Sequence, residues 1–197
     1  MSPNPRTNGP ANMNSEKEIR VHVRWMVRRD LPEVIGIEQA CFEFPWCEED
    51  FLHCLRQRNC IGMVAEHEGH VVGFMIYEIP RNRIHLLNVA TSPEYRHRGV
   101  ASQMVRKLIG KIAKQQRSRI VLEVRETNLP ALLFFRALGF RATNILRNFY
   151  EEMTEDAYRM QYCLPAEQQA ASVPKMMFSA SAPEVIGREQ VIEYNET

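Results

Sequence analysis

The most regular amphipathic segment of the sequence directly follows a short apolar run, and a polar loop joins the two. In residues 101–114 the apolar side chains recur with the 3.6-residue period of an α-helix, opposite a basic side. Residues 84–91 are apolar enough for a buried central strand. A helix with one apolar side needs a surface to cover. The pair therefore predicts an α/β domain in which this helix packs on a sheet.

The segments on either side of this pair add further elements. Strands are predicted at 20–28, 62–66, 71–79, 119–125, 140–150 and 157–164, with a hairpin turn at 68–70. Helices are predicted at 30–41, 48–58 and 128–138 from apolar residues at helical spacing. Asp30 is expected to cap the first helix, and Gly139 to end the last one. The order β-α-α-β-β-β-α-β-α-β-β predicts one mixed sheet with helices on both faces.

Composition limits the class of protein. The chain has 197 residues, of which 45% are apolar, so it is not wholly disordered. No apolar run approaches the roughly 20 residues of a membrane-spanning helix, so no membrane partner is expected. The first 17 residues lack the apolar region of a signal peptide, which predicts a cytoplasmic protein. We expect one domain at 20–164, between flexible extensions at 1–19 and 165–197.

Charge and cysteine content exclude further classes. With 25 basic and 24 acidic residues the chain is nearly neutral, whereas a nucleic-acid-binding protein gathers a strong basic excess on one face. We therefore expect no direct nucleic-acid partner. The 5 cysteines are an odd number in a chain without a secretory signal, so structural disulfides are not expected. Their spacing matches no common zinc pair, which predicts a site without metal.

The loop before the amphipathic helix has the sequence Arg96-His97-Arg98-Gly99-Val100-Ala101. A helix N-terminus presents unpaired backbone N–H groups and the positive end of a dipole, so a phosphate can bind there directly. Gly99 has no Cβ and lets a ligand approach the backbone, and Arg96 and Arg98 can add charge-assisted hydrogen bonds. The turn fits a small polyanion. The alternative is an exposed basic turn closed by a glycine.

This turn resembles the pyrophosphate-binding turn of the GNAT acetyltransferases, whose co-substrate is acetyl-CoA. Three more segments look like the branch of that family that acetylates protein N-termini, nearest to the ribosomal-protein alanine acetyltransferases. They are Phe44-Pro45-Trp46, Leu122-Glu123-Val124-Arg125 followed by Asn128, and Arg147-Asn148-Phe149-Tyr150 with 155–160. The resemblance covers about residues 20–163. It implies the GNAT fold, a mostly antiparallel, twisted sheet of about seven strands with about four helices on both faces.

The resemblance also implies roles for individual residues. Glu123 matches the general base of the alanine-acetylating enzymes, the alternative being a strand-edge ion pair with Arg125 or Arg141. Phe44, Trp46 and Tyr150 would wall the entrance for the substrate's N-terminus, although Phe44 and Trp46 fit a plug between two helices equally well. The residues expected to hold acetyl-CoA are Val89, Ala90, Thr91, Arg96, His97, Arg98, Gly99, Val100, Ala101, Ser102 and Asn128.

One position departs from the family pattern. Phe135 stands where the family has a tyrosine that donates a proton to the departing thiolate, and phenylalanine cannot donate one. A positioned acid contributes about 10²- to 10⁴-fold to a rate, so its loss predicts a slow enzyme, a substitute donor or no turnover. His85 is the candidate for proton transfer, because the strand period puts it on the same face as Leu87 and Val89. The alternative is a packed, hydrogen-bonded histidine.

These residues favour an acetyl-CoA-dependent N-acetyltransferase that acts by direct attack of the α-amine of a protein, with a ribosomal protein as the expected substrate. An α-amine with a pKa of about 7.8 is roughly one-seventh neutral at pH 7, whereas a lysine at about 10.4 is almost wholly charged. A single carboxylate therefore suits an α-amine better. Two alternatives remain: acetylation of a lysine or a small-molecule amine, and a non-catalytic module that binds acetyl-CoA.

Overall fold

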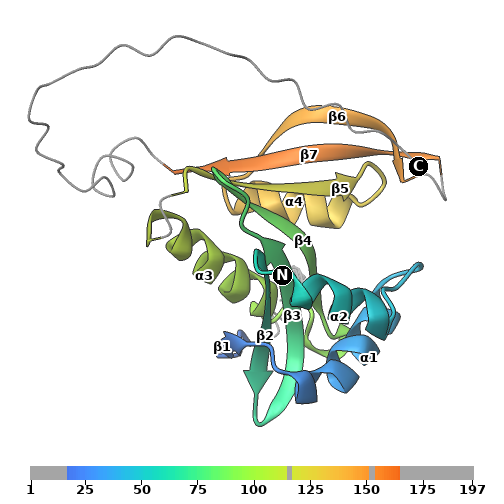
Figure 1. Ribbon diagram of the computed structural model, residues 1–197, viewed down its shortest axis with the longest axis vertical. Helices are drawn as coiled ribbons and strands as arrows, with labels where there is room; N and C mark the ends of the chain where they lie inside the picture. The colour runs from blue at the N-terminus through green and yellow to red at the C-terminus, as the bar shows by residue number, and fades with distance from the viewer. Residues whose placement is uncertain (1–16, 115–116, 151–153, 165–197) are drawn as a thin grey trace, which may run out of the picture.

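The computed structural model describes residues 17–114, 117–150 and 154–164, and Figure 1 shows their arrangement. In this part of the chain seven strands form one sheet in the order β1-β2-β3-β4-β5-β7-β6. Neighbouring strands are antiparallel except β4 and β5, which are parallel. The predicted mixed, mostly antiparallel sheet is therefore confirmed. The strands are β1 (His22–Trp25), β2 (Cys60–His67), β3 (His70–Glu78), β4 (Arg83–Thr91), β5 (Arg119–Arg125), β6 (Arg141–Tyr150) and β7 (Glu155–Cys163).

Two helices cover each face of the sheet (Figure 1). The helices are α1 (Leu31–Cys41), α2 (Glu48–Arg56), α3 (Val100–Lys114) and α4 (Leu129–Ala137). On one face the core includes Met104 and Leu108 of α3 and Phe135 of α4. On the other face it includes Val34 of α1 and Phe51 of α2. Each fully buried side chain of this size contributes about 1.5–3 kcal/mol, so the two cores fix the helices on the sheet.

Local signals in the sequence account for several element ends. The β2–β3 hairpin turns at Glu68 and Gly69, whose φ angles of 51° and 85° match the left-handed residues of a tight hairpin turn. At the start of α4, Asn128 Oδ1 accepts a hydrogen bond of 3.1 Å from the backbone N of Ala131. Gly139, with φ of 92°, follows the end of that helix as predicted.

Asp30 precedes α1, but the prediction that its side chain caps the helix is wrong. Its two carboxylate oxygens instead accept hydrogen bonds of 2.7 and 2.9 Å from the guanidinium of Arg24. The backbone N of Val27 donates a further bond of 2.8 Å. The paired guanidinium lowers the pKa of Asp30, which is 3% exposed. A bidentate pair with a guanidinium is geometrically specific as well as charge-assisted, and it anchors β1 to the start of α1.

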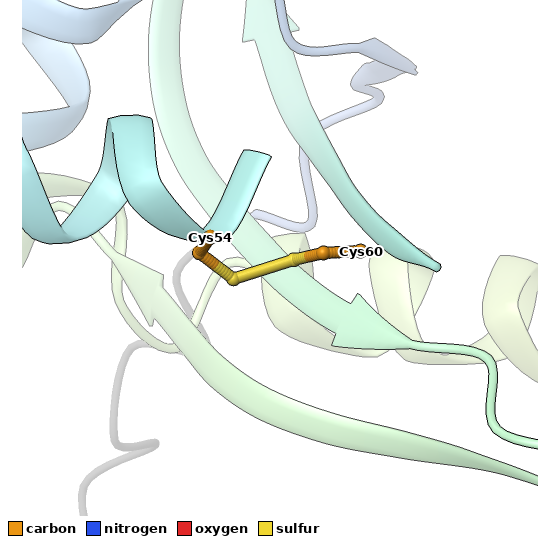
Figure 2. The surroundings of a disulfide bond; sticks show 2 residues. All are labelled: Cys54 and Cys60. Atoms are coloured by element: carbon orange, nitrogen blue, oxygen red, sulfur yellow. A yellow bond between two sulfur atoms is a disulfide. The ribbon is translucent and has the colours of Figure 1, made fainter. Parts of the chain in front are cut away.

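Cys54 at the end of α2 and Cys60 at the start of β2 form a disulfide bond (Figure 2). The expectation of no structural disulfide is therefore wrong. Arg56 ends the helix and the chain turns back, which leaves the two Cα atoms 6.1 Å apart, within bridging range. An odd cysteine count is compatible with one bridge, and Cys41, Cys47 and Cys163 are free.

No helix in the described ranges is long and apolar enough to cross a membrane. The predicted C-terminal extension and residues 1–16 of the N-terminal one lie outside the described residues. The domain limits at 19 and 164 stay predictions.

Candidate active site

The strands β4 and β5 run together for a short distance and then part. Their register pairs Arg83–His85 with Arg119–Val121. Beyond this point β4 continues beside β3, while β5 continues beside β7, and Figure 1 shows the two halves of the sheet diverging. A cleft of about 840 Å³ opens between them, which is the size of a small-molecule site.

The cleft collects part of the predicted site. Residues 86–89 of β4 and 122–125 of β5 form two of its walls, and the α1–α2 loop and α4 add the others. The predicted site residues that line it are Phe44, Trp46, Val89, Glu123, Asn128 and Tyr150. The turn at 96–102 does not line the cleft and lies beyond the end of β4.

Glu123 is held between two basic side chains in this cleft. Its Oε2 lies 2.6 Å from His85 Nε2, and its Oε1 accepts a hydrogen bond of 2.9 Å from Arg159 Nε. The side chain is 8% exposed. Burial raises the pKa of Glu123, but the hydrogen bonds from His85 and Arg159 outweigh it, so the pKa is lowered from 4.5. Glu123 is therefore a carboxylate at neutral pH.

The alternative ion-pair partners predicted for Glu123 are wrong. Arg125 instead lies 3.6 Å from Glu43 of the α1–α2 loop, and its guanidinium lies 5.4 Å from the ring centre of Tyr150. Arg141 pairs with Gln161 in the ladder of β6 and β7, two strands away from β5. The basic partner that the sequence analysis missed is Arg159, the register neighbour of Glu123 on β7.

A β-bulge in β4 changes which residues lie on the same face of the sheet as His85. Ile76 pairs with Asn88 and Tyr77 with Leu86, so Leu87 is an extra residue in the strand. Leu87 packs against the core under α1 and α2, whereas Val89 packs against the core under α3 and α4. The expectation that His85, Leu87 and Val89 share one face is therefore wrong for Val89, because a bulge shifts the two-residue period.

Phe135 lies in the wall of the cleft, at the position where the family pattern has a proton-donating tyrosine. It is 5% exposed, and its ring packs edge to face with Phe134 and Phe140 at centroid distances of 5.0 and 5.3 Å. Its phenyl group has no proton to give. Tyr150 also lines the cleft, and burial raises the pKa of its hydroxyl, so this group stays protonated at neutral pH.

Phe44 and Trp46 both line the cleft. Phe44 is 48% exposed and lines the cleft, so it is not a plug between helices. Trp46 packs edge to face on Phe51 of α2, with centroids 5.4 Å apart, and also lines the cleft. Trp46 thus fits both predicted alternatives, a plug between helices and a wall of the cleft. One part of its side chain packs beside α2, and another part faces the cleft.

The turn before α3 has the backbone expected for close approach. His97 and Gly99 have φ angles of 59° and 81°, in the left-handed region that favours glycine. A Cβ on Gly99 would lie 2.8 Å from the side chain of Glu18, which rests against the turn. The backbone N of Ile19 donates to Arg98 O at 3.1 Å, so the segment at 18–19 follows the turn.

Of the other predicted residues, Thr91 lies at the end of β4, and Arg96 and Arg98 lie in the turn itself. Thr91 ends β4, and its Oγ1 is buried without a hydrogen-bond partner in the described part of the chain. Its backbone O accepts a hydrogen bond of 3.3 Å from Cys41 Sγ. Arg96 donates a hydrogen bond of 3.2 Å to the same sulfur, and the Arg98 guanidinium lies 5.4 Å from the ring centre of Tyr95.

Two further polar residues of the site were missed. Glu38 of α1 is 1% exposed and lines the cleft together with Asn88 of β4. A signal for Glu38 exists in the sequence, because it lies seven residues after Leu31 and four after Val34, on the apolar side of the helix. An acid at such a position is buried and needs a partner.

Comparisons with known proteins show the family of this chain. Residues 31–140 match the acetyltransferase (GNAT) family. Ribosomal protein bS18-alanine N-acetyltransferase of Escherichia coli (strain K12) is 31% identical over 121 residues, covering 61% of this chain and 81% of the relative. An N-alpha-acetyltransferase of Sulfolobus acidocaldarius is 24% identical over 160 residues, covering 75% of this chain and 95% of the relative.

A solved structure confirms the fold. The crystal structure of the ribosomal-protein-S18-alanine N-acetyltransferase from Escherichia coli matches with a TM-score of 0.69 and 25% identity, over 81% of this chain and 99% of that chain. The resemblance noted in the turn, the entrance loop and β5 is thereby confirmed at the level of family and fold. The chain belongs to the GNAT family of acetyltransferases and is an N-acetyltransferase.

Proposed function

We propose that this enzyme transfers acetyl from acetyl-CoA to the N-terminal α-amine of a protein, with a ribosomal protein as its substrate. The observation that carries the proposal is the hydrogen bond of His85 to Glu123, which lines the cleft between β4 and β5. The names of the Escherichia coli and Sulfolobus acidocaldarius relatives support an N-terminal amine as the acceptor. A ribosomal substrate fits the cytoplasmic location that the sequence predicts.

The residues at the end of β4 suit acetyl-CoA. Thr91 Oγ1, buried without a partner in the described residues, offers a hydrogen bond to a ligand beside the strand. The N-terminal amides of α3, Gly99 and the cations Arg96 and Arg98 suit its diphosphate. When bound, acetyl-CoA supplies the thioester that is attacked. Val89 and Ala90 would lie along its acetyl and pantetheine part, and Asn128 further along it.

Glu123 and His85 together accept the proton that the acceptor amine loses. An amine must lose a proton as it attacks a carbonyl carbon, and a group nearby must accept that proton. Glu123, ionised and hydrogen-bonded to His85, orients the imidazole. We assign proton acceptance to this pair, with His85 as the relay and Glu123 as its carboxylate.

The departing thiolate depends less on a proton-transferring side chain than the attacking amine does. A thiol has a pKa near 8.5, so a thiolate is a fair leaving group at neutral pH even though Phe135 cannot donate. Tyr150 brings a protonated hydroxyl to the same cleft. The enzyme therefore turns over without the tyrosine usual at position 135, at a rate below that of an enzyme that has one.

The proposal is tested by incubating the protein with acetyl-CoA and a pool of peptides that differ in their first residue. Mass spectrometry then shows which peptides gain an acetyl group. The proposal expects product on a subset of peptides that begin with small residues such as alanine. Product only on ε-amines or small amines would favour the other acetyltransferase class, and calorimetric binding of acetyl-CoA without any product would favour a binding module.

A further inference from the structure

Glu38 joins the entrance loop to β4 through its carboxylate. Its Oε1 accepts a hydrogen bond of 3.0 Å from the backbone N of Trp46. The side-chain Nδ2 of Asn88 lies 3.1 Å from both Oε1 and Oε2. We call this set, Trp46–Glu38–Asn88, the clasp. It brings together residues from α1, from the loop before α2 and from the bulge of β4.

The clasp is held in an apolar setting. Glu38 is 1% exposed, and within the described ranges no basic side chain forms an ion pair with it. Burial raises its pKa, against the two hydrogen bonds that favour the carboxylate. A buried carboxyl group is costly unless it is hydrogen-bonded. An apolar side chain would serve at this position if packing were its only role. The buried carboxyl group therefore has a role beyond packing.

The two ends of the clasp lie at different parts of the cleft. Trp46 closes the loop that carries Phe44, the exposed aromatic of the entrance. Asn88 lies next to Val89, whose backbone is assigned to the acetyl group in the proposed function. Glu38 therefore links the peptide entrance directly to the acetyl-binding strand.

We infer that Glu38 is a positioning residue that fixes the entrance loop against β4 and so sets the affinity for the peptide substrate. It acts through Trp46 and Asn88 and does not contact the reacting atoms. The inference rests on the proposed function for the identity of the substrate. The clasp itself is a property of the protein without substrate.

Three variants of helix α1 test the inference by kinetics. E38A removes both acceptors, leaves Trp46 N and Asn88 Nδ2 without a partner, and should raise KM for the peptide about tenfold. The value of kcat and the affinity for acetyl-CoA should change less than about twofold. E38Q keeps an amide oxygen that accepts both bonds, so its KM should stay close to that of the wild type.

The matched control is E33A on the same helix. Glu33 Oε2 also accepts a backbone hydrogen bond, of 3.0 Å from Val71 N, but Glu33 does not line the cleft. E33A should cost stability without raising KM. Should E38A fold poorly, N88D tests the opposite end of the clasp, because it sets one carboxylate against another and should raise KM in the same way.

Fluorescence quenching tests the clasp without any substrate. The sequence has 2 tryptophans, and W25F leaves Trp46 as the emitting one. In this background E38A should increase the quenching of Trp46 by acrylamide, whereas E33A and E38Q should not. Quenching and KM that are the same in E38A and the wild type would overturn the inference, as would an equal rise of KM in E33A. Failure of the wild type to acetylate any N-terminus would refute the proposed function. The quenching result would still show whether Glu38 holds the loop that carries Trp46.

Discussion

His85 Nε2 on β4 lies 2.6 Å from Glu123 Oε2 on β5, at the point where these two parallel strands separate. The two side chains point to the same face of the sheet because the residues flanking each of them, Leu86 and Leu122 among them, pack in the core of the other face. Arg159 completes the arrangement on the second carboxylate oxygen. A carboxylate between two donors is a good orienting group and a weak base, and for this reason the proposed function assigns the proton exchange to His85.

Replacement of His85 by phenylalanine should lower kcat at saturating substrate about 10²-fold, because the proton relay is lost while the ring volume is kept. H70F is the matched control, since His70 is exposed at the β2–β3 hairpin and does not line the cleft. Steady-state kinetics of both variants give the comparison. Equal turnover in H85F and the wild type would assign His85 to packing.

The ionised state of Glu123 makes a part of stability depend on pH. Its pKa is lowered from 4.5, since the hydrogen bonds from His85 and Arg159 outweigh the effect of burial. The stability it contributes is therefore present above about pH 4.5 and is lost as the pH falls through the lowered pKa. In E123Q the free energy of unfolding should decline less steeply in this acidic range. Denaturant titrations at a series of pH values measure both slopes, and parallel curves would contradict the pairing.

A tyrosine at position 135 should restore the proton donor that the family pattern contains. Phe135 lines the cleft, so we expect the added hydroxyl of F135Y to face it. We expect kcat to rise about tenfold. F134Y is the control, because Phe134 does not line the cleft and should give no gain. A folded F135Y without higher turnover would show that the departure of the thiolate is not limiting.

Removal of Glu18 should strengthen binding of acetyl-CoA. Its side chain rests against Gly99 in the turn assigned to the diphosphate, so two negative groups would meet there. We expect E18A to lower Kd about threefold, as is usual for an exposed charge. Calorimetry at low and high salt measures the effect, which should shrink as salt screens it. E68A, at the tip of the hairpin, should leave Kd unchanged, and an E18A variant that binds more weakly would mean that Glu18 supports the turn.

The disulfide bond determines how many of the cysteines can react with a thiol reagent. In denaturant without reductant, 3 of the 5 cysteines should react with a thiol reagent, and all 5 after reduction. The bridge spans a sequence separation of 6, for which loop closure contributes about 2 kcal/mol. Reduction should lower the stability of the wild type and leave that of C54S/C60S unchanged. Five reactive thiols before reduction would contradict the bridge.

The parts of the structure that the sequence predicts well are those with local causes. The 3.6-residue period of α3, the hairpin at Gly69 and the end of α4 before Gly139 depend on residues within one or two turns of chain. Their order then leaves few ways to arrange the sheet. The backbone of the turn before α3 is equally local, since Gly99 and the start of α3 are adjacent in sequence.

The features that sequence analysis missed depend on which strands lie side by side. Arg159 reaches Glu123 only because β7 inserts between β5 and β6. The extra residue Leu87 in β4 is visible only against the register of β3, and it turns Val89 to the other face. The bond of Cys54 to Cys60 likewise requires the chain to fold back after α2. Long-range pairing, which local periodicity does not encode, decides each of these.

The most direct test of the proposed chemistry is the position of the acetyl group on one peptide that begins with alanine and contains one internal lysine. After incubation with acetyl-CoA, fragmentation in the mass spectrometer assigns the added mass to the α-amine or to the ε-amine. We predict acetylation of the α-amine, with H85F giving the same product more slowly. Acetylation of the lysine alone, or no product despite bound acetyl-CoA, would contradict the account.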